Sequence, residues 1–143
     1  MPIRRRMVLC APALLPVCPG SAFAGDTPAA KDAFLYFISP LDGQRVRSGF
    51  PCRFGLRNMG VAPAGAAAPN TGHHHLLIDV EEALDPVAPV PADRRHLHFG
   101  TGQTETRVDL PSGLHTLQLV LADANHMLFN PPVVSQRIRI RVA

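Results

Sequence analysis

The sequence predicts an all-β protein, a single sandwich of antiparallel strands with two long loops. Short alternating or apolar runs are separated by turn residues throughout the chain. No segment sustains the apolar period of 3.6 that a helical domain requires. The 143 residues include 15 prolines and 11 glycines and no tryptophan, a composition that supplies many turns between short strands.

The first 24 residues have the features of a secretory signal peptide. Three arginines, Arg4 to Arg6, precede a short apolar stretch from Met7 to Val17. Ala22-Phe23-Ala24 fits the small-x-small rule for cleavage, so the mature chain is expected to begin near Gly25. The apolar stretch is shorter than the ~20 residues that a membrane span needs. We therefore expect signal peptide 1–24, a periplasmic or secreted protein, and no integral membrane segment in the mature chain.

The net charge of +3 belongs to the precursor. Its 14 Lys and Arg residues include the three arginines of the signal peptide, which leaves 11 basic against 11 acidic residues in the mature chain. A formally neutral domain gives no indication of binding to nucleic acid or to an anionic membrane. We expect neither partner.

Cysteine usage excludes an internal disulfide in the exported domain. Cys10 and Cys18 lie in the signal peptide, and Val17 before Cys18 is bulkier than a lipoprotein cleavage site normally has there. Cys52 shares the alternation of Phe50 and Phe54, which predicts a buried small hydrophobe in preference to a reactive or intermolecularly paired thiol.

About 119 mature residues make one ordinary domain, and we expect it to span 34–143 after a flexible N-terminus at 25–33. The first strand is 34–38, followed by the turn residues of 39–43. A second strand, 50–57, places its apolar residues on one face, namely Phe50, Cys52, Phe54 and Leu56.

The two long loops flank the third strand. Residues 58–72 are rich in Gly, Ala and Pro, without strand-like alternation. The third strand runs over 73–80, and the second loop, 81–95, contains three prolines. Long loops in a compact domain are uncommon and often functional.

Three further strands are expected after the short extended segment 96–98. They cover 103–110, 114–123 and 133–142. The core faces of the last two carry Leu117, Leu119 and Leu121, then Ile138, Ile140 and Val142. His115 shares the core face of its strand, at the end where that strand begins.

Several motifs are specific enough to carry a resemblance. The Ser39-Pro40-Leu41-Asp42-Gly43 turn and the stretch 110–117 resemble bacterial immunoglobulin-like domains, which implies that the sandwich is immunoglobulin-like. Over 34–142 the chain resembles an uncharacterised exported bacterial family, domain of unknown function 4399. The carrying residues are Gly60 to Gly65, Asn70 to His75 and His98 to Glu105. The family brings no established activity.

The seven histidines are the candidates for function. Alternate strand residues share a face, so His73 and His75 project together and His96 and His98 form a second pair. With His115 they are the predicted metal ligands, and His74 and His126 are further candidates. Imidazole suits copper and zinc, so either ion is the expected cofactor.

The face that the histidine pair occupies is left open by the sequence, because the third strand is apolar on both sides. If Leu76 and Ile78 point inward, His74 is buried near His115, and His73 and His75 face the loops. If Leu77 points inward, the His73 and His75 pair converges on His115.

An alternative without metal is a hydrogen-bond network in which the histidines attach the loops to the sandwich. The protein is then an interaction domain for an unknown envelope protein. Around either kind of site we expect supporting contacts from Asn70, Gln103 and Glu105. No nucleophile elbow, phosphate loop or metalloprotease helix is present, so the prediction is a binding module. Hydrolysis by a metal-bound water is the third alternative, and it requires an open coordination position.

Overall fold

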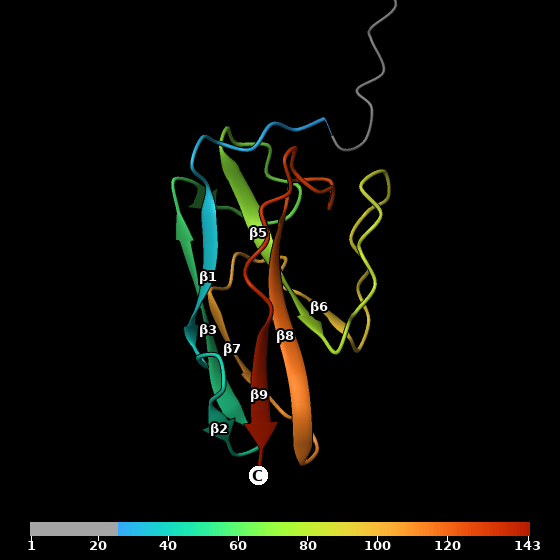
Figure 1. Cartoon of the computed structure of the whole chain (residues 1–143). Coiled ribbons are helices and arrows are strands. Elements are labelled where there is room, and N and C mark those ends of the chain that lie inside the picture. Colours follow the sequence, from blue (N-terminus) through green and yellow to red (C-terminus); the bar gives the residue numbers. More distant parts are fainter. Residues whose placement is uncertain (1–25) are drawn as a thin grey trace, which may run out of the picture.

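The structure is a computed structural model, and it describes residues 26–143. The predicted signal peptide lies outside the described residues. Within these residues, nine strands form two sheets (Figure 1). The three-stranded sheet has the order β1-β3-β7, and the other sheet has the order β2-β9-β8-β5-β4, with β6 also paired to β5. The strands are β1 Phe34–Ser39, β2 Arg45–Val46, β3 Phe50–Arg57, β4 Gly60–Val61, β5 Thr71–Ile78, β6 His96–His98, β7 Glu105–Val108, β8 Gly113–Ala122 and β9 Ile138–Val142.

The all-β prediction is confirmed, with corrections at the strand ends. β5 begins at Thr71, two residues earlier than expected, and it ends at Ile78 because Asp79 takes a positive φ of 53° that an extended strand does not allow. The last strand becomes regular only at Ile138, although Val134 makes an isolated bridge to Val120.

The sequence did not predict β2 and β4. Each has two residues, too few to show alternation, and β4 lies inside the segment expected to be a loop. β2 pairs with β9 and β4 pairs with β5 in parallel, so the larger sheet is mixed and not purely antiparallel. The immunoglobulin-like character of the sandwich stays a prediction.

The two sheets enclose one apolar core. Alternate residues of β3 pack against alternate residues of β8 and β9, as the period of two requires. The predicted inward residues of β8 and β9 are all buried, and Cys52 of β3 has no exposed surface. Burial raises the pKa of the Cys52 thiol to about 12. It is therefore a packing residue, as the sequence predicts.

A second apolar cluster covers the opposite face of the larger sheet. Leu77 of β5 and Val120 of β8 meet residues of two loops there, the loop 79–95 and the loop that follows β8. The other members are Val80, Val90, Ala122 and Leu128. Since both of its faces are covered, β5 is buried along almost its whole length.

The first described residues pack against the loop that follows β8. The backbone amide of Ala29 donates to the carbonyl of Asn130, and the amide of Asn130 donates to the carbonyl of Thr27. These bonds hold residues 27–29, part of the segment expected to be flexible, against the domain.

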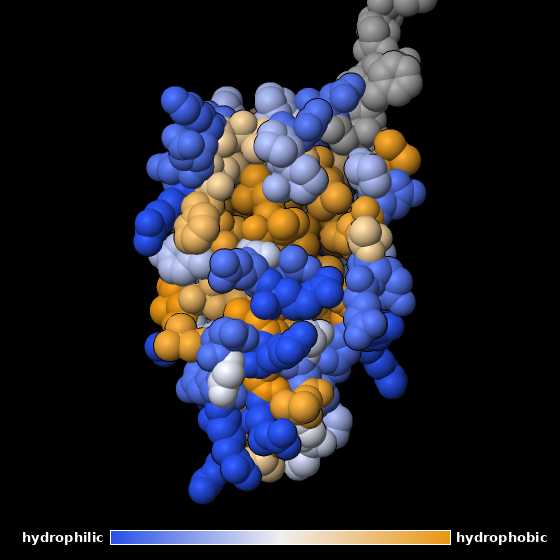
Figure 2. Space-filling view, in the orientation of Figure 1, coloured by the Kyte–Doolittle hydropathy of each residue, from blue (hydrophilic) through white to orange (hydrophobic). Residues whose placement is uncertain are grey.

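Apolar residues gather in the upper half of one face, between β1 and the 79–95 loop (Figure 2). β1 is the edge of its sheet, and it leaves Phe34 and Ile38 about half exposed, at 51% and 52%.

In the described part of the chain, no helix has the length and apolar character needed to cross a membrane.

The environment of Cys52 predicts an unreactive thiol. With its pKa near 12, only on the order of one thiol in ten thousand is ionised at pH 8. Iodoacetamide should label Cys52 over hours in the native protein and within minutes in 6 M guanidinium chloride. Equal labelling rates in the two conditions would contradict the buried placement.

Candidate metal centre

Strand β5 sends its three histidines to two different faces. His74 points into the main core, with its ring 5.2 Å from that of Phe54. His73 and His75 point the other way, beside Leu77, and neither has exposed surface. The structure thus adopts the alternative in which Leu76 and Ile78 face inward.

Strand β6 brings a third imidazole to this outer face. β6 pairs antiparallel with β5, and His98 lies directly opposite His75. Directly opposed residues point to the same side of a sheet. The ring of His98 is 5.0 Å from that of His75 and 5.0 Å from that of His73, measured between centroids.

The fourth imidazole comes from the turn that follows β8. Ala122 at the end of β8 lies opposite His73, so the next residues of the chain pass over His73. The Asp123 carboxylate accepts the backbone amides of Asn125 and Met127, which closes the turn. His126 has a positive φ of 66° at its tip, and its ring lies 4.9 Å from that of His73.

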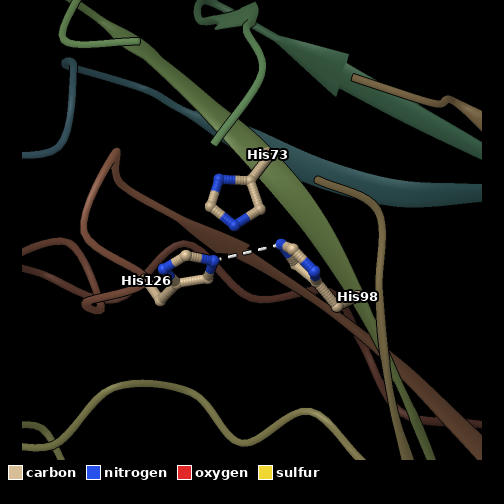
Figure 3. Close-up of side chains that lie close together, drawn as sticks. All are labelled: His73, His98 and His126. Carbon is tan, nitrogen blue, oxygen red and sulfur yellow. Dashed lines mark hydrogen bonds between the residues drawn. The ribbon is translucent and has the colours of Figure 1, made fainter. Parts of the chain in front are cut away.

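The four rings form two close pairs of nitrogens. Nε2 of His73 is 3.1 Å from Nε2 of His75, and Nε2 of His98 is 3.2 Å from Nε2 of His126. One nitrogen from each of His73, His98 and His126 lies within 4.8 Å of the other two. Figure 3 shows these three rings turned toward a common space, each carried by a different segment.

Three of the clustered histidines, His73, His75 and His98, are held in the neutral state. Burial first, and the neighbouring histidines second, lower the pKa of His73 to about 4 and that of His75 to about 3. The pKa of His98 is also lowered, by partial burial and by His126. At pH 7 His73, His75 and His98 therefore have a free lone pair and no charge that would repel a cation.

Burial leaves part of the site without hydrogen bonds. Nδ1 of His73 and Nδ1 of His75 are fully buried, and neither has a hydrogen-bond partner in the described part of the chain. Both ring nitrogens of His74 are in the same position. The backbone of Gln103 opposes the lowering of the His74 pKa, but it makes no hydrogen bond of normal geometry, and burial brings that pKa to about 4.

Two of the predicted ligands lie elsewhere. Nδ1 of His96 is 2.9 Å from a carboxylate oxygen of Asp93 in its own loop. At the far end of β8, the two nitrogens of His115 bind Asp79 at 2.7 Å and the carbonyl of Pro111 at 2.9 Å. Both nitrogens of His115 are thus engaged in fixing the end of β5 to β8, and it is not close to His74 either.

The predicted supporting residues do not bind the cluster. Glu105 belongs to β7 of the other sheet, where it pairs with Arg53 at 3.1 Å. The side chain of Gln103 accepts the backbone amide of Thr101. Asn70 is exposed at the turn before β5. These residues were predicted from their closeness in sequence to the histidines. That closeness does not bring them near the cluster, because the chain passes to the other sheet after β6.

A glycine makes room for His98. A β-carbon built on Gly100 would lie 2.3 Å from Cε1 and 2.8 Å from Nε2 of the His98 ring. The ring therefore occupies the space that a side chain at position 100 would take. Gly100 therefore allows the His98 ring to take its place in the cluster.

The turn that carries His126 had a signal in the sequence. Asp123-x-x-His126 comes directly after the clearest predicted strand, and an aspartate that starts a turn can cap the amides that follow it. What was missing was the register, since only the pairing of His73 with Ala122 places this turn over His73.

The comparisons with known proteins give a family and no activity. The family model described as "Domain of unknown function (DUF4399)" matches residues 52–143. The chain belongs to this family. The four clustered histidines and Gly100 all lie within the matched residues, so the site is part of the DUF4399 domain. No curated protein and no solved structure matches the chain.

The lowered pKa values predict how the metal-free protein responds to acid. Unfolded histidines titrate near pH 6.5, whereas His73 and His75 in the folded protein take up protons only near pH 4 and pH 3. The unfolded state binds more protons between these limits, so stability is full above pH 6.5 and falls as the pH is lowered toward 4. Each histidine contributes roughly 3 kcal/mol to this loss.

Urea unfolding of chelator-treated protein between pH 4 and pH 8 measures this dependence. A His75→Gln variant, which cannot titrate at that position, should show a shallower decline. An unfolding free energy that stays constant from pH 7 to pH 4.5 would contradict the neutral, buried state of these residues.

Proposed function

We propose that this DUF4399 protein is an exported binding module that holds one copper or zinc ion on His73, His75, His98 and His126. The observation that carries the proposal is the convergence of imidazoles from three separate segments, β5, β6 and the turn after β8. Long-range convergence of this kind does not follow from sequence proximity, since His73 and His126 are 53 positions apart in the printed sequence.

The spacing of the nitrogens fits a metal of this size. Tetrahedral coordination with bonds of ~2.0 Å places neighbouring ligand atoms ~3.3 Å apart. The two Nε2 pairs, at 3.1 and 3.2 Å, already have that separation. One nitrogen from each of His73, His98 and His126 lies within 4.8 Å of the other two, so shortening these distances by up to about 1.5 Å through ring rotation brings the three to coordination spacing, with His75 joined through its close pairing to His73.

The donor set selects the kind of ion. Neutral imidazoles suit late first-row metals, and Cu²⁺ binds a given nitrogen site more tightly than its neighbours in that row. Zn²⁺ accepts the same ligands and prefers tetrahedral geometry. The only cysteine of the described residues, Cys52, is in the main core and offers the site no thiolate.

The alternative of a metal-free hydrogen-bond network fits the site less well. A network that exists to fix the loops should satisfy its buried polar atoms, because an unpartnered one costs ~1–3 kcal/mol. Here Nδ1 of His73 and of His75 are buried without partners. Coordination through Nε2 leaves each Nδ1 unpartnered as well, but the metal–nitrogen bonds add a favourable free energy that a hydrogen-bond network does not supply.

Binding and not catalysis is the proposed role. Catalytic zinc sites keep an open position for water or substrate, whereas four protein ligands close the coordination sphere. The His73 and His75 side is fully buried, while His98 is exposed and His126 is partly so. An ion would enter and leave on the side of His98 and His126.

The direct test is metal titration of tag-free protein purified after export of the full-length chain. We expect one Cu²⁺ or Zn²⁺ per molecule by calorimetry. Replacing His73 and His75 together by Gln should weaken binding by more than about 100-fold, because loss of a ligand costs more than loss of an outer hydrogen bond. The matched controls are His96→Gln and His115→Gln, which remove imidazoles outside the cluster and should leave affinity unchanged.

Absence of binding at micromolar Cu²⁺ and Zn²⁺ would overturn the proposal. Retention of full affinity in the double variant would overturn the assignment of the ligands. If the metal-free interaction domain is correct instead, the double variant changes thermal stability and metal has no effect on either protein.

We expect the Gly100→Ala substitution to weaken metal binding without destabilising the fold. The new methyl group displaces the His98 ring, whose exposed end is free to move, while the φ of Gly100 is one that alanine tolerates. We expect metal affinity to fall about tenfold, within the 10–100-fold range for disturbed ligand support, and urea unfolding of the metal-free protein to change little. Unchanged affinity would show that His98 is not a ligand.

A further inference from the structure

Asp123 is a buried carboxylate without a cationic partner. Only 7% of its surface is exposed. Its oxygens accept three hydrogen bonds, from the hydroxyl of Thr27 at 2.6 Å and from the amides of Asn125 at 2.8 Å and Met127 at 2.9 Å. Among the described residues, no Lys, Arg or His side chain forms an ion pair with it. Buried charges in proteins are normally paired or placed beside metal ions.

The position of Asp123 links it to the histidine cluster. It follows Ala122, which lies opposite His73, and its negative charge opposes the lowering of the His73 pKa by burial. It also closes the turn that carries His126. The Asp123 side chain thus helps to position His126 and also affects the pKa of His73.

Residues near the start of the described chain complete this arrangement. The hydroxyl of Thr27 donates to Asp123 across 96 positions of the sequence, and the backbone of 27–29 is bonded to Asn130 in the same loop. The hydroxyl holds one carboxylate oxygen while the turn amides hold the other. The carboxylate is therefore fixed from both sides.

We propose that Asp123 is a positioning residue and the counter-charge of the metal centre, held in place by Thr27 as part of the site. The inference rests on the proposed function, because it assigns a role toward the ion that the four histidines would hold. A fixed negative charge that acts on His73 favours a divalent cation bound there, and the same carboxylate orients the His126 turn. The sequence had predicted Asn70, Gln103 and Glu105 for such a role.

Asp123→Asn separates the charge from the hydrogen bonds. The Asn side-chain oxygen still accepts the two turn amides, and its NH₂ group donates to the oxygen of Thr27, so the turn keeps its shape. We expect Cu²⁺ or Zn²⁺ affinity to fall 10–100-fold. The matched control is Asp42→Asn, which removes the same charge from a carboxylate that accepts the amide of Arg139, opposite Thr116 near the far end of β8. Its affinity should equal that of the wild type.

A second readout distinguishes this role from a structural one. In the metal-free protein the Asp123 charge is buried without a counter-charge, so the melting temperature of metal-free Asp123→Asn should equal or exceed that of the wild type. A residue that serves only the turn would leave both the melting temperature and the metal affinity unchanged, because Asn keeps the hydrogen bonds of the turn.

Thr27→Val tests whether the Thr27 hydroxyl positions Asp123. It also replaces Asp123→Asn as the test if that variant does not fold. It removes the hydroxyl and keeps the charge, and we expect an affinity loss of roughly tenfold that Thr27→Ser restores. If Asp123→Asn binds metal as tightly as the wild type, the inference is wrong and the histidine site is unaffected. The same conclusion follows from wild-type affinity in Thr27→Val if Asp123→Asn does not fold. Absence of metal binding by the wild type overturns the proposed function itself.

Discussion

The burial of β5 on both faces is the constraint on which the rest of the structure depends. Its even-numbered residues pack in the main core, and its odd-numbered residues pack under the two loops of the outer face. A strand with two buried faces requires both sheet partners and both covering layers in fixed positions. The imidazoles of His73 and His75 are carried inside that frame and cannot swing to solvent.

Burial also determines the chemistry of those imidazoles. Removal from water holds His73 and His75 neutral far below the usual histidine range. Neutral rings pack against one another without repulsion, and they leave lone pairs available to a cation. The exposed end of the cluster, at His98, keeps a way in and out.

The parts of this structure that follow from local pattern were predictable. Alternation located β3, β8 and the inward residues of β9, because apolar residues recur at every second position on the core face of each strand. It also divided the triple histidine correctly, with His74 opposite its neighbours. It did not choose between the two faces, because β5 is apolar on both sides and the period of two is then uninformative.

The membership of the cluster depends on contacts between distant segments. His98 was predicted together with His96 because the two residues share a face of their strand. The pairing of β6 with β5 places His98 opposite His75, whereas His96 lies opposite Leu77 and contacts Asp93. His115 was expected in the site because it shares a face with the core of β8, but it lies at the other end of that strand. His126 required the register of β8 against β5, which no local pattern contains.

The coordination number of the loaded protein tests the central claim most directly. X-ray absorption at the metal edge of the zinc- or copper-loaded protein counts imidazole ligands through the scattering of their outer ring atoms. The account predicts four imidazoles at ~2.0 Å and no sulfur ligand. A spectrum with two or fewer imidazoles and mainly oxygen ligands would contradict it.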